Sequence, residues 1–436
     1  GTNVKVDAGP TGTIDLGGDV TAEGGDVVVT TDDGYINTTG AVTANNDVNV
    51  DTLNGAINLG GLVDAETGFV NVSTANGSIT TGGYVSGHKD VTLNSDGGDI
   101  TVDGYTESET QNVTATVKGD GNISFAGTVS ASGDVEAEVT GKGDITTGTG
   151  AEVSGTDISF TTNEGNITTG SDLTADKNVD LNVNTGNITF GGDVTANEGN
   201  ITIDITGDGN LKDAENRDNT LTAISVDGSE DAGNIIIHLG GKGDVDLYDL
   251  YATNNARLDI QNGNLTLHEI DGELVAMQLR SEGKDMNVDK ITAGTQIVLN
   301  GSDMSLDDIA QRPDADGMLV VTPNGAADDK PIDNFTIGNI TTNTGSGIRF
   351  DHLWVNNSDI HIDQGQLWFD KLYVENAAHF SNNEMVAAIY GVPPLRDGSD
   401  SVYWNNTAEN RPEDNLDMWL NGSGDWMYLR FTDDHI

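Results

Sequence analysis

Residues 12–18 read GTIDLGG, and their first three letters begin a phrase of glycine, any residue and isoleucine that returns through the first half of the chain. Successive isoleucines of the phrase are 21 to 23 residues apart. A fixed period of this length is typical of a solenoid, in which each repeat forms one coil and stacks on the next. The isoleucines that we expect to stack in the core are Ile14, Ile36, Ile57, Ile79, Ile100, Ile123, Ile145, Ile167 and Ile188.

Each repeat contains three short stretches in which every second residue is apolar. In the first repeat these are residues 14–16, 20–22 and 27–29, and the pairs Gly17-Gly18 and Gly24-Gly25 separate them. Period-two alternation predicts strands, and paired glycines predict turns. No repeat contains an apolar stripe of helical spacing long enough for a helix. We therefore predict an all-β chain that forms a right-handed parallel β-helix with about 21–23 residues per coil.

The corner phrase itself is interpreted as structural. Its glycine is expected to allow a positive φ at the corner of each coil. The residue after the glycine changes along the chain, from Thr13 in the first repeat to Asn122, Asn166 and Asn187 in later ones. Stacked asparagines form hydrogen-bonded ladders, so this row is predicted to hold coils together rather than to bind a ligand.

The chain is strongly acidic, with 71 acidic and 19 basic residues and a formal net charge of −52. Such a surface repels phosphates, so neither nucleic acid nor an anionic membrane is expected as a partner. Two interpretations of the charge remain open. One is solubility with repulsion between neighbouring molecules, and the other is cation binding, above all of Ca²⁺ between coils.

Other features of the composition point to the cell exterior. Cysteine is absent, which is frequent among exported bacterial surface proteins. No apolar run reaches the roughly 18 residues of a membrane-spanning helix, so no membrane insertion is expected. The chain begins at Gly1 without a visible signal peptide, and we interpret this N-terminus as the product of a cut. We expect an extracellular position at the bacterial cell surface.

The regularity changes along the chain and predicts four parts. Residues 1–306 form the β-helical shaft, which is regular to about residue 205 and looser after it. Residues 307–334 contain Pro313, Pro323 and Pro331 and are expected to leave the stack. Residues 335–380 return to strand patterns and supply the last coils. Residues 381–436 are an irregular, aromatic C-terminal module.

The aromatic residues of this module have two interpretations. They can line a surface on which sugars stack, or they can cap the open end of the β-helix. An uncovered last coil leaves unpaired backbone N–H and C=O groups and promotes aggregation between edges, so we favour the cap. The candidate residues for contact or capping are Trp404, Trp419, Trp426, Tyr428 and Phe431.

We expect no enzymatic activity and no certain cofactor. β-Helical enzymes that degrade polysaccharides need clustered carboxylates beside a basic residue or a general acid, whereas basic residues are scarce in the regular half of this chain. Asp99 and Asp144 share a corner position with Thr13 and Ala56, which suits a turn better than catalysis. Residues 240–247 depart from the calcium-binding nonapeptide, and its tandem repeat is missing. Calcium at separate Asp-rich corners stays open as a candidate ligand.

The C-terminal stretch carries a resemblance. The segments AAIYGVPP (387–394), RDG (396–398), SVYWNN (401–406) and DWMYLRF (425–431) resemble the end module of very large leukotoxin-type filamentous adhesins of anaerobic diderm bacteria. The coils upstream are similar to the shaft of filamentous-haemagglutinin-like exoproteins. The resemblance implies a surface-exported filamentous protein that attaches its cell to other surfaces.

The sequence thus leads to one hypothesis and two alternatives. The first is a bacterial cell-surface adhesin or filament protein that makes contact through a rigid rod. Its partners would be neighbouring rods, or glycans or proteins on host or bacterial surfaces. The second is a structural subunit of an extracellular fibre or sheath that assembles by head-to-tail stacking. The third, which we favour least, is a carbohydrate-active enzyme.

Overall fold

A computed structural model describes residues 2–215, 218–226, 228–326, 330–343, 346–369, 372–382, 387–391, 404–405 and 418–421. Within these ranges the chain is nearly all β, and its parallel strands stack in about 16 coils, which confirms the predicted parallel β-helix. The chain divides into two compact units, Gly1–Gly233 and Asn234–Ile436. No helix in the described ranges is long and apolar enough to cross a membrane.

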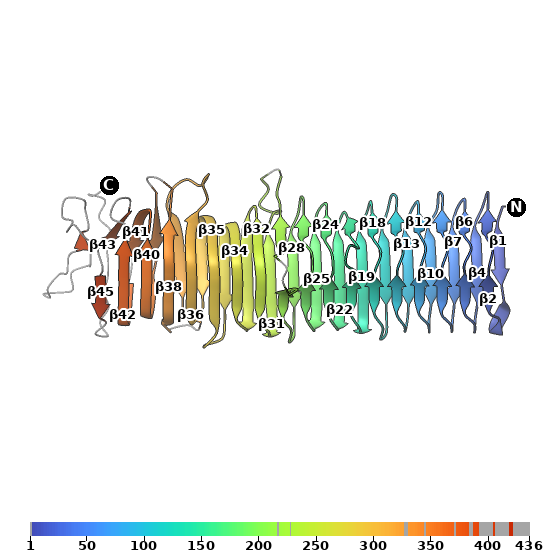
Figure 1. Cartoon of the computed structure of the whole chain (residues 1–436), viewed down its shortest axis with the longest axis horizontal. Coiled ribbons are helices and arrows are strands. Elements are labelled where there is room, and N and C mark those ends of the chain that lie inside the picture. Colours follow the sequence, from blue (N-terminus) through green and yellow to red (C-terminus); the bar gives the residue numbers. More distant parts are fainter. Residues whose placement is uncertain are drawn as a thin grey trace. The chain divides into compact units, whose positions relative to one another are not determined.

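In unit 1 every coil contributes one strand to each of three rows, and each strand pairs in parallel with the strand three places along the chain. Figure 1 shows these strands side by side from the blue end of the chain to its green part. The first row, which follows the corner phrase, contains β2 (Ile14–Leu16), β5 (Ile36–Thr38), β8 (Ile57–Leu59), β11 (Ile79–Thr81), β14 (Ile100–Val102), β17 (Ile123–Phe125), β20 (Ile145–Thr147), β23 (Ile167–Thr169), β26 (Ile188–Phe190) and β29 (Leu211–Asp213).

The second row of unit 1 is equally short, and the third row is longer. The second row contains β3 (Val20–Ala22), β6 (Val42–Ala44), β9 (Val63–Ala65), β12 (Val85–Gly87), β15 (Thr106–Ser108), β18 (Val129–Ala131), β21 (Val153–Gly155), β24 (Leu173–Ala175), β27 (Val194–Ala196) and β30 (Thr220–Ala223). The third row contains β1 (Val4–Asp7), β4 (Val27–Thr31), β7 (Val48–Thr52), β10 (Val70–Thr74), β13 (Val91–Ser95), β16 (Val113–Val117), β19 (Val135–Lys142), β22 (Ile158–Glu164), β25 (Val179–Thr185) and β28 (Ile201–Ile205). A single 3₁₀ turn, η1 (Gly9–Thr11), follows β1.

The isoleucines of the corner phrase form one stacked row inside unit 1. Ile79, for example, is in register with Ile57 of the preceding coil and Ile100 of the following one. Ile14 is 4% exposed, and every later member of the row is at most 1% exposed. Each buried isoleucine contributes about 1.5 to 3 kcal/mol, but only when the neighbouring coils cover it. Stability therefore depends on stacking.

Unit 2 has longer strands, and most of them pair in parallel with the strand two places along the chain. Its core is filled by larger side chains: Phe350 packs against Phe335 and Phe369, with ring centroids 6.1 and 5.5 Å away. The parallel strands, drawn from yellow-green to red in Figure 1, are β31 (Ile235–Lys242), β32 (Val245–Ala252), β33 (Asn255–Asn262), β34 (Leu265–Leu279), β35 (Asp285–Asn300), β36 (Asp303–Gln311), β37 (Leu319–Asn324), β38 (Ile332–Thr341), β39 (Gly347–Phe350), β40 (Leu353–Ile362), β41 (Gly365–Phe369), β42 (Leu372–Asn382) and β43 (Ala387–Gly391).

The segment 307–334, which we expected to leave the stack, contributes strands to it. The strands β36 and β38 overlap its two ends, and β37 lies within it. Pro323 is in register with Leu299 of β35, at the second-last position of β37. A proline near a strand end removes little from the ladder, because the strand is about to stop. Pro313 and Pro331 lie between strands, so these prolines mark turns of the solenoid.

The corner glycines are required by the approach of one coil to the next, which corrects our expectation about their φ angles. Gly98 and Gly186 have positive φ values of 145° and 143°, whereas Gly77 and Gly165 have no such value. At all of these positions a Cβ would lie under 3.0 Å from the carbonyl oxygen of the corner glycine one coil earlier. The common cause is therefore steric, and a positive φ accompanies it only in some coils.

We expect the substitution Gly165→Ala to lower the free energy of unfolding by about 2 kcal/mol or more, because the new methyl group must displace the backbone of the preceding coil. The matched control is Gly24→Ala, since a Cβ at Gly24 meets nothing within 4 Å. The control should change stability by less than about 0.5 kcal/mol. Urea unfolding followed by circular dichroism measures both, and equal midpoints for the two variants would contradict the steric explanation.

Candidate functional site

The residue between glycine and isoleucine forms a hydrogen-bonded ladder in unit 1, which we call the corner ladder. The backbone N–H and the Nδ2 of Asn166 both donate to Oδ1 of Asp144, at 2.7 and 2.9 Å. Oδ1 of Asn166 in turn accepts both donors of Asn187, at 2.9 and 3.0 Å. The predicted asparagine ladder thus also contains aspartates as acceptors. Its members are Asp99, Asn122, Asp144, Asn166, Asn187 and Asn210.

A second ladder, which the sequence analysis missed, lies at the start of the third strand row. Oδ1 of Asn112 accepts the backbone N–H of Asp134 at 2.8 Å, and Oδ1 of Asp157 accepts that of Asn178 at 2.8 Å. In the sequence, this second ladder is indicated by an Asp or Asn directly before the first apolar residue of successive third-row strands. Its members are Asp90, Asn112, Asp134, Asp157, Asn178 and Asn200.

Aspartates at the corner before the second strand row of unit 1 also accept backbone N–H groups of the next coil. A surface depression of about 380 Å³ is lined in part by Asp172, Asp193 and Asp218. Oδ1 of Asp172 accepts the N–H of Asp193 at 2.9 Å, and Oδ1 of Asp193 accepts the N–H of Thr220 at 2.8 Å. Among the residues that the structure describes, no group of three or more His, Asp or Glu side chains is arranged to hold a metal ion.

Exposed apolar side chains gather beside the second strand row of unit 1. Tyr84 and Tyr105 directly precede β12 and β15, and their rings stack with centroids 5.1 Å apart and planes inclined by 15°. They are 38% and 37% exposed, and Leu62 before β9 continues the row at 37%. By contrast, Phe125 of the same unit is fully buried. The row therefore leaves part of its apolar surface exposed to solvent.

Polar groups surround these rings. The hydroxyl of Tyr84 donates a hydrogen bond to Glu107, and burial together with this bond raises the pKa of Tyr84 to about 12, so the hydroxyl stays protonated well into the alkaline range. Ser86, 4% exposed, lies in register between Asp64 and Glu107. Burial raises the pKa of the Asp64 carboxyl, although its hydrogen bond with Ser86 opposes this, and the charge of nearby Glu66 adds to the increase.

A hydrogen bond completes this surface: Nδ1 of His88 lies 2.8 Å from Oε2 of Glu109. The surface combines two stacked aromatic rings with several carboxylates on adjacent coils. We refer to it as the tyrosine patch, and its members are Leu62, Asp64, Glu66, Tyr84, Ser86, His88, Tyr105, Glu107 and Glu109.

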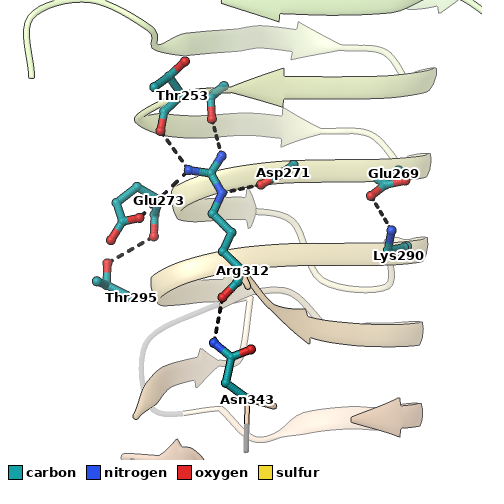
Figure 2. A network of polar contacts seen from close by, with 9 residues as sticks. Thr253, Glu269, Asp271, Glu273, Lys290, Thr295, Arg312 and Asn343 are labelled. Carbon is teal, nitrogen blue, oxygen red and sulfur yellow. Dashed lines mark hydrogen bonds and ion pairs between the residues drawn. The ribbon is translucent and has the colours of Figure 1, made fainter. Parts of the chain in front are cut away.

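Unit 2 contains a largely buried arginine that contacts distant segments of the chain, as Figure 2 shows. Nε of Arg312 donates to Oδ1 of Asp271 at 2.6 Å, and its Nη1 and Nη2 donate to the carbonyl oxygens of Thr253 and Ala252 at 2.9 and 2.6 Å. Its Cζ lies 5.9 Å from the centroid of the Tyr251 ring. The Arg312 side chain is only 13% exposed.

The backbone of Arg312 is fixed as well. Its N–H donates to the carbonyl oxygen of Ala293 at 2.9 Å, and its carbonyl oxygen accepts Nδ2 of Asn343 at 2.8 Å, as Figure 2 shows for the second bond. Burial raises the pKa of the Asp271 carboxyl, and the Arg312 charge opposes that increase. We call this set of contacts the arginine clamp. It holds several coils of unit 2 together through one side chain.

A histidine of unit 2 also rests on a tyrosine. The ring of His268 stacks on Tyr248, with centroids 4.1 Å apart and planes inclined by 6°. Nδ1 of His268 lies 2.7 Å from Oδ1 of Asp249, and this hydrogen bond raises the pKa of His268. The carboxylate therefore favours the charged imidazolium on the aromatic face.

The parallel stack of unit 2 ends in antiparallel strands. β44 (Trp404–Asn405) pairs with β43, where Trp404 lies opposite Gly391, and β45 (Met418–Asn421) pairs with β42, where Trp419 lies opposite His379. Added strands of this kind occupy part of the edge of the last coil, and the capping role of the aromatic residues stays a prediction. The other candidates of the C-terminal module, Trp426, Tyr428 and Phe431, lie outside the described residues.

Comparisons with protein-family models, with curated proteins and with solved structures found no match to this chain.

We expect Arg312→Met to lower the free energy of unfolding by about 3 kcal/mol at about pH 8, because it leaves the carboxylate of Asp271 without its counter-charge. Protonation of Asp271 relieves that unpaired charge. Since the folded-state pKa of Asp271 is already raised by burial and rises further without Arg312, the loss must be smaller at about pH 5 than at about pH 8.

The matched control for the clamp is Arg280→Met in the same unit. Arg280 makes a bidentate pair with Asp259 at 2.7 and 2.8 Å, but the two side chains are 45% and 35% exposed. An exposed pair contributes about 1 kcal/mol or less. Denaturant unfolding at both pH values measures all variants, and equal losses for Arg312→Met and Arg280→Met would contradict a buried clamp.

Proposed function

We propose that this chain belongs to a bacterial cell-surface adhesin, in which the stacked coils form a shaft that presents contact surfaces outside the cell. The proposal rests on the β-solenoid fold together with the resemblance of the C-terminal segments to leukotoxin-type adhesins. Its partners are glycans or proteins on the surface of host or bacterial cells. Its location is extracellular.

The observation that carries the proposal is the register of outward side chains. Thr168 of β23 is in register with Thr146 of the preceding coil and Thr189 of the following coil. Adjacent strands lie about 4.8 Å apart, so the same chemistry returns at that spacing along the sheet. Many weak contacts in a fixed array produce strong attachment through multivalency, without a single deep binding site.

A catalytic role is not part of the proposal. Asp99 and Asp144, the carboxylates weighed for catalysis, each accept two hydrogen bonds from the next coil in the corner ladder. A general base must be available to a substrate proton, and Oδ1 of each carboxylate is already occupied by two structural donors.

The fibre alternative is less well supported. Head-to-tail stacking of β-helices requires a free strand edge at the end of the last coil. In unit 2 parts of this edge are already paired, residues 377–380 of β42 with β45 and residues 390–391 of β43 with β44. A neighbouring molecule would have to displace these strands before it continued the stack.

We expect the purified full chain to remain monomeric in sedimentation and free of filaments in negative-stain electron microscopy. Beads coated with it should attach to bacterial or host cells, and attachment should rise steeply with coating density, because each contact is weak. The control is beads coated at equal density with an unrelated acidic protein. Filaments would favour the fibre alternative, and attachment no greater than that of the control at every density would overturn the adhesin proposal.

A further inference from the structure

The tyrosine patch combines exposed rings and negative charge without a cation to match them. Its carboxylates come from Asp64, Glu66, Glu107 and Glu109, and the basic member is His88, which is engaged with Glu109. Among the described residues, no lysine or arginine side chain lies over either tyrosine ring. Lys89, the nearest lysine in sequence, follows His88 in an exposed turn. The patch thus offers aromatic faces and acceptors together.

Unit 2 shows how the chain itself satisfies the same combination of groups. At Tyr251 the ring carries the guanidinium of Arg312, which is bound by Asp271. At Tyr248 the ring carries the imidazole of His268, which is bound by Asp249. In both cases a planar, nitrogen-bearing side chain rests on a tyrosine ring while an adjacent carboxylate binds it.

We infer that the tyrosine patch binds the guanidinium group of an arginine-bearing peptide segment on a partner protein. A planar guanidinium stacks on the outer surface of the Tyr84–Tyr105 pair and donates hydrogen bonds to the Glu107 carboxylate, which also accepts the Tyr84 hydroxyl. The net charge of −52 attracts basic segments from a distance. The inference deepens the adhesin proposal and rests on it, because it names the chemistry of one partner.

The geometry favours arginine over the other occupants of such a surface. Lysine carries a compact, strongly hydrated ammonium group. This group cannot stack flat on an aromatic ring and cannot form a bidentate pair of hydrogen bonds with a carboxylate. A neutral sugar can stack on a ring, but it has no charge to match the four carboxylates. The hydroxyl of Tyr84, held by Glu107, fixes one ring in place, so little side-chain freedom is lost when a flat group binds.

The test uses the full chain and a short acetylated and amidated peptide with two arginines separated by one glycine. Isothermal titration calorimetry at physiological salt measures the affinity, with the matching two-lysine peptide and a neutral cello-oligosaccharide as further probes. We expect the arginine peptide to bind more tightly than both. Tyr84→Ala combined with Tyr105→Ala should weaken it about tenfold or more, and Glu107→Gln should weaken it about threefold to tenfold.

Two matched controls separate the patch from the general charge of the chain. Tyr35→Ala removes another exposed tyrosine of unit 1, 51% exposed at a corner, and Glu198→Gln removes an exposed charge several coils away. Both should leave the affinity within about twofold of the original. Equal binding of lysine and arginine peptides, an equal loss for Glu198→Gln and Glu107→Gln, or no binding of the arginine peptide at all would overturn the inference. Tighter binding of the oligosaccharide, lost with the tyrosines, would assign the patch to sugars instead.

The cell-attachment assay distinguishes this inference from the proposed function. If coated beads attach and the double tyrosine variant attaches equally well, the adhesin proposal stands and the patch is not its contact. If the original chain does not attach, the adhesin proposal fails, while the peptide titration still decides what the patch binds. Attachment that falls with the tyrosines and is inhibited by the arginine peptide supports both.

Discussion

The backbone hydrogen bonds between parallel coils are the constraint on which the rest of unit 1 depends. They fix the register, and a shift by one residue would turn every inward side chain outward. The glycine row lets consecutive corners approach closely enough for this ladder to continue through the bend. Once the register holds, the isoleucine row, both amide and carboxylate ladders and the outward threonines follow from the repeat.

Much of this could be read from the sequence, because a repeat turns spacing along the chain into position in space. The period identified the isoleucine row, whereas the terminal cap that the aromatic composition suggested stays a prediction. The reason for the corner glycines could not be read, since sequence carries no distance between coils. Tyr84 and Tyr105 are 21 positions apart, and that spacing was the available signal for the tyrosine patch.

Other features required the structure because they join segments that no period relates. Arg312 reaches Asp271 and the carbonyl of Ala252, 41 and 60 positions away. The partners of Arg312 depend on how the longer strands of unit 2 turn. From the sequence, the prolines indicated only that residues 307–334 leave the stack. The structural role of the many aspartates was equally impossible to derive from the sequence. A carboxylate before a strand looks like a solvated turn residue until its oxygen is found on the N–H group of the next coil.

The sameness of the rows has a consequence for how such a chain changes its length over generations. If residues 100–122 were deleted, Ile79 would lie in register with Ile123 and Gly98 with Gly143, so each core position would still pair with a residue of the same type. A whole-coil gain or loss therefore leaves the packing intact, whereas a deletion of a few residues would break the register. Genes for such chains can lengthen or shorten in steps of one coil. Recombination between repeats can therefore change the number of coils without creating a new fold.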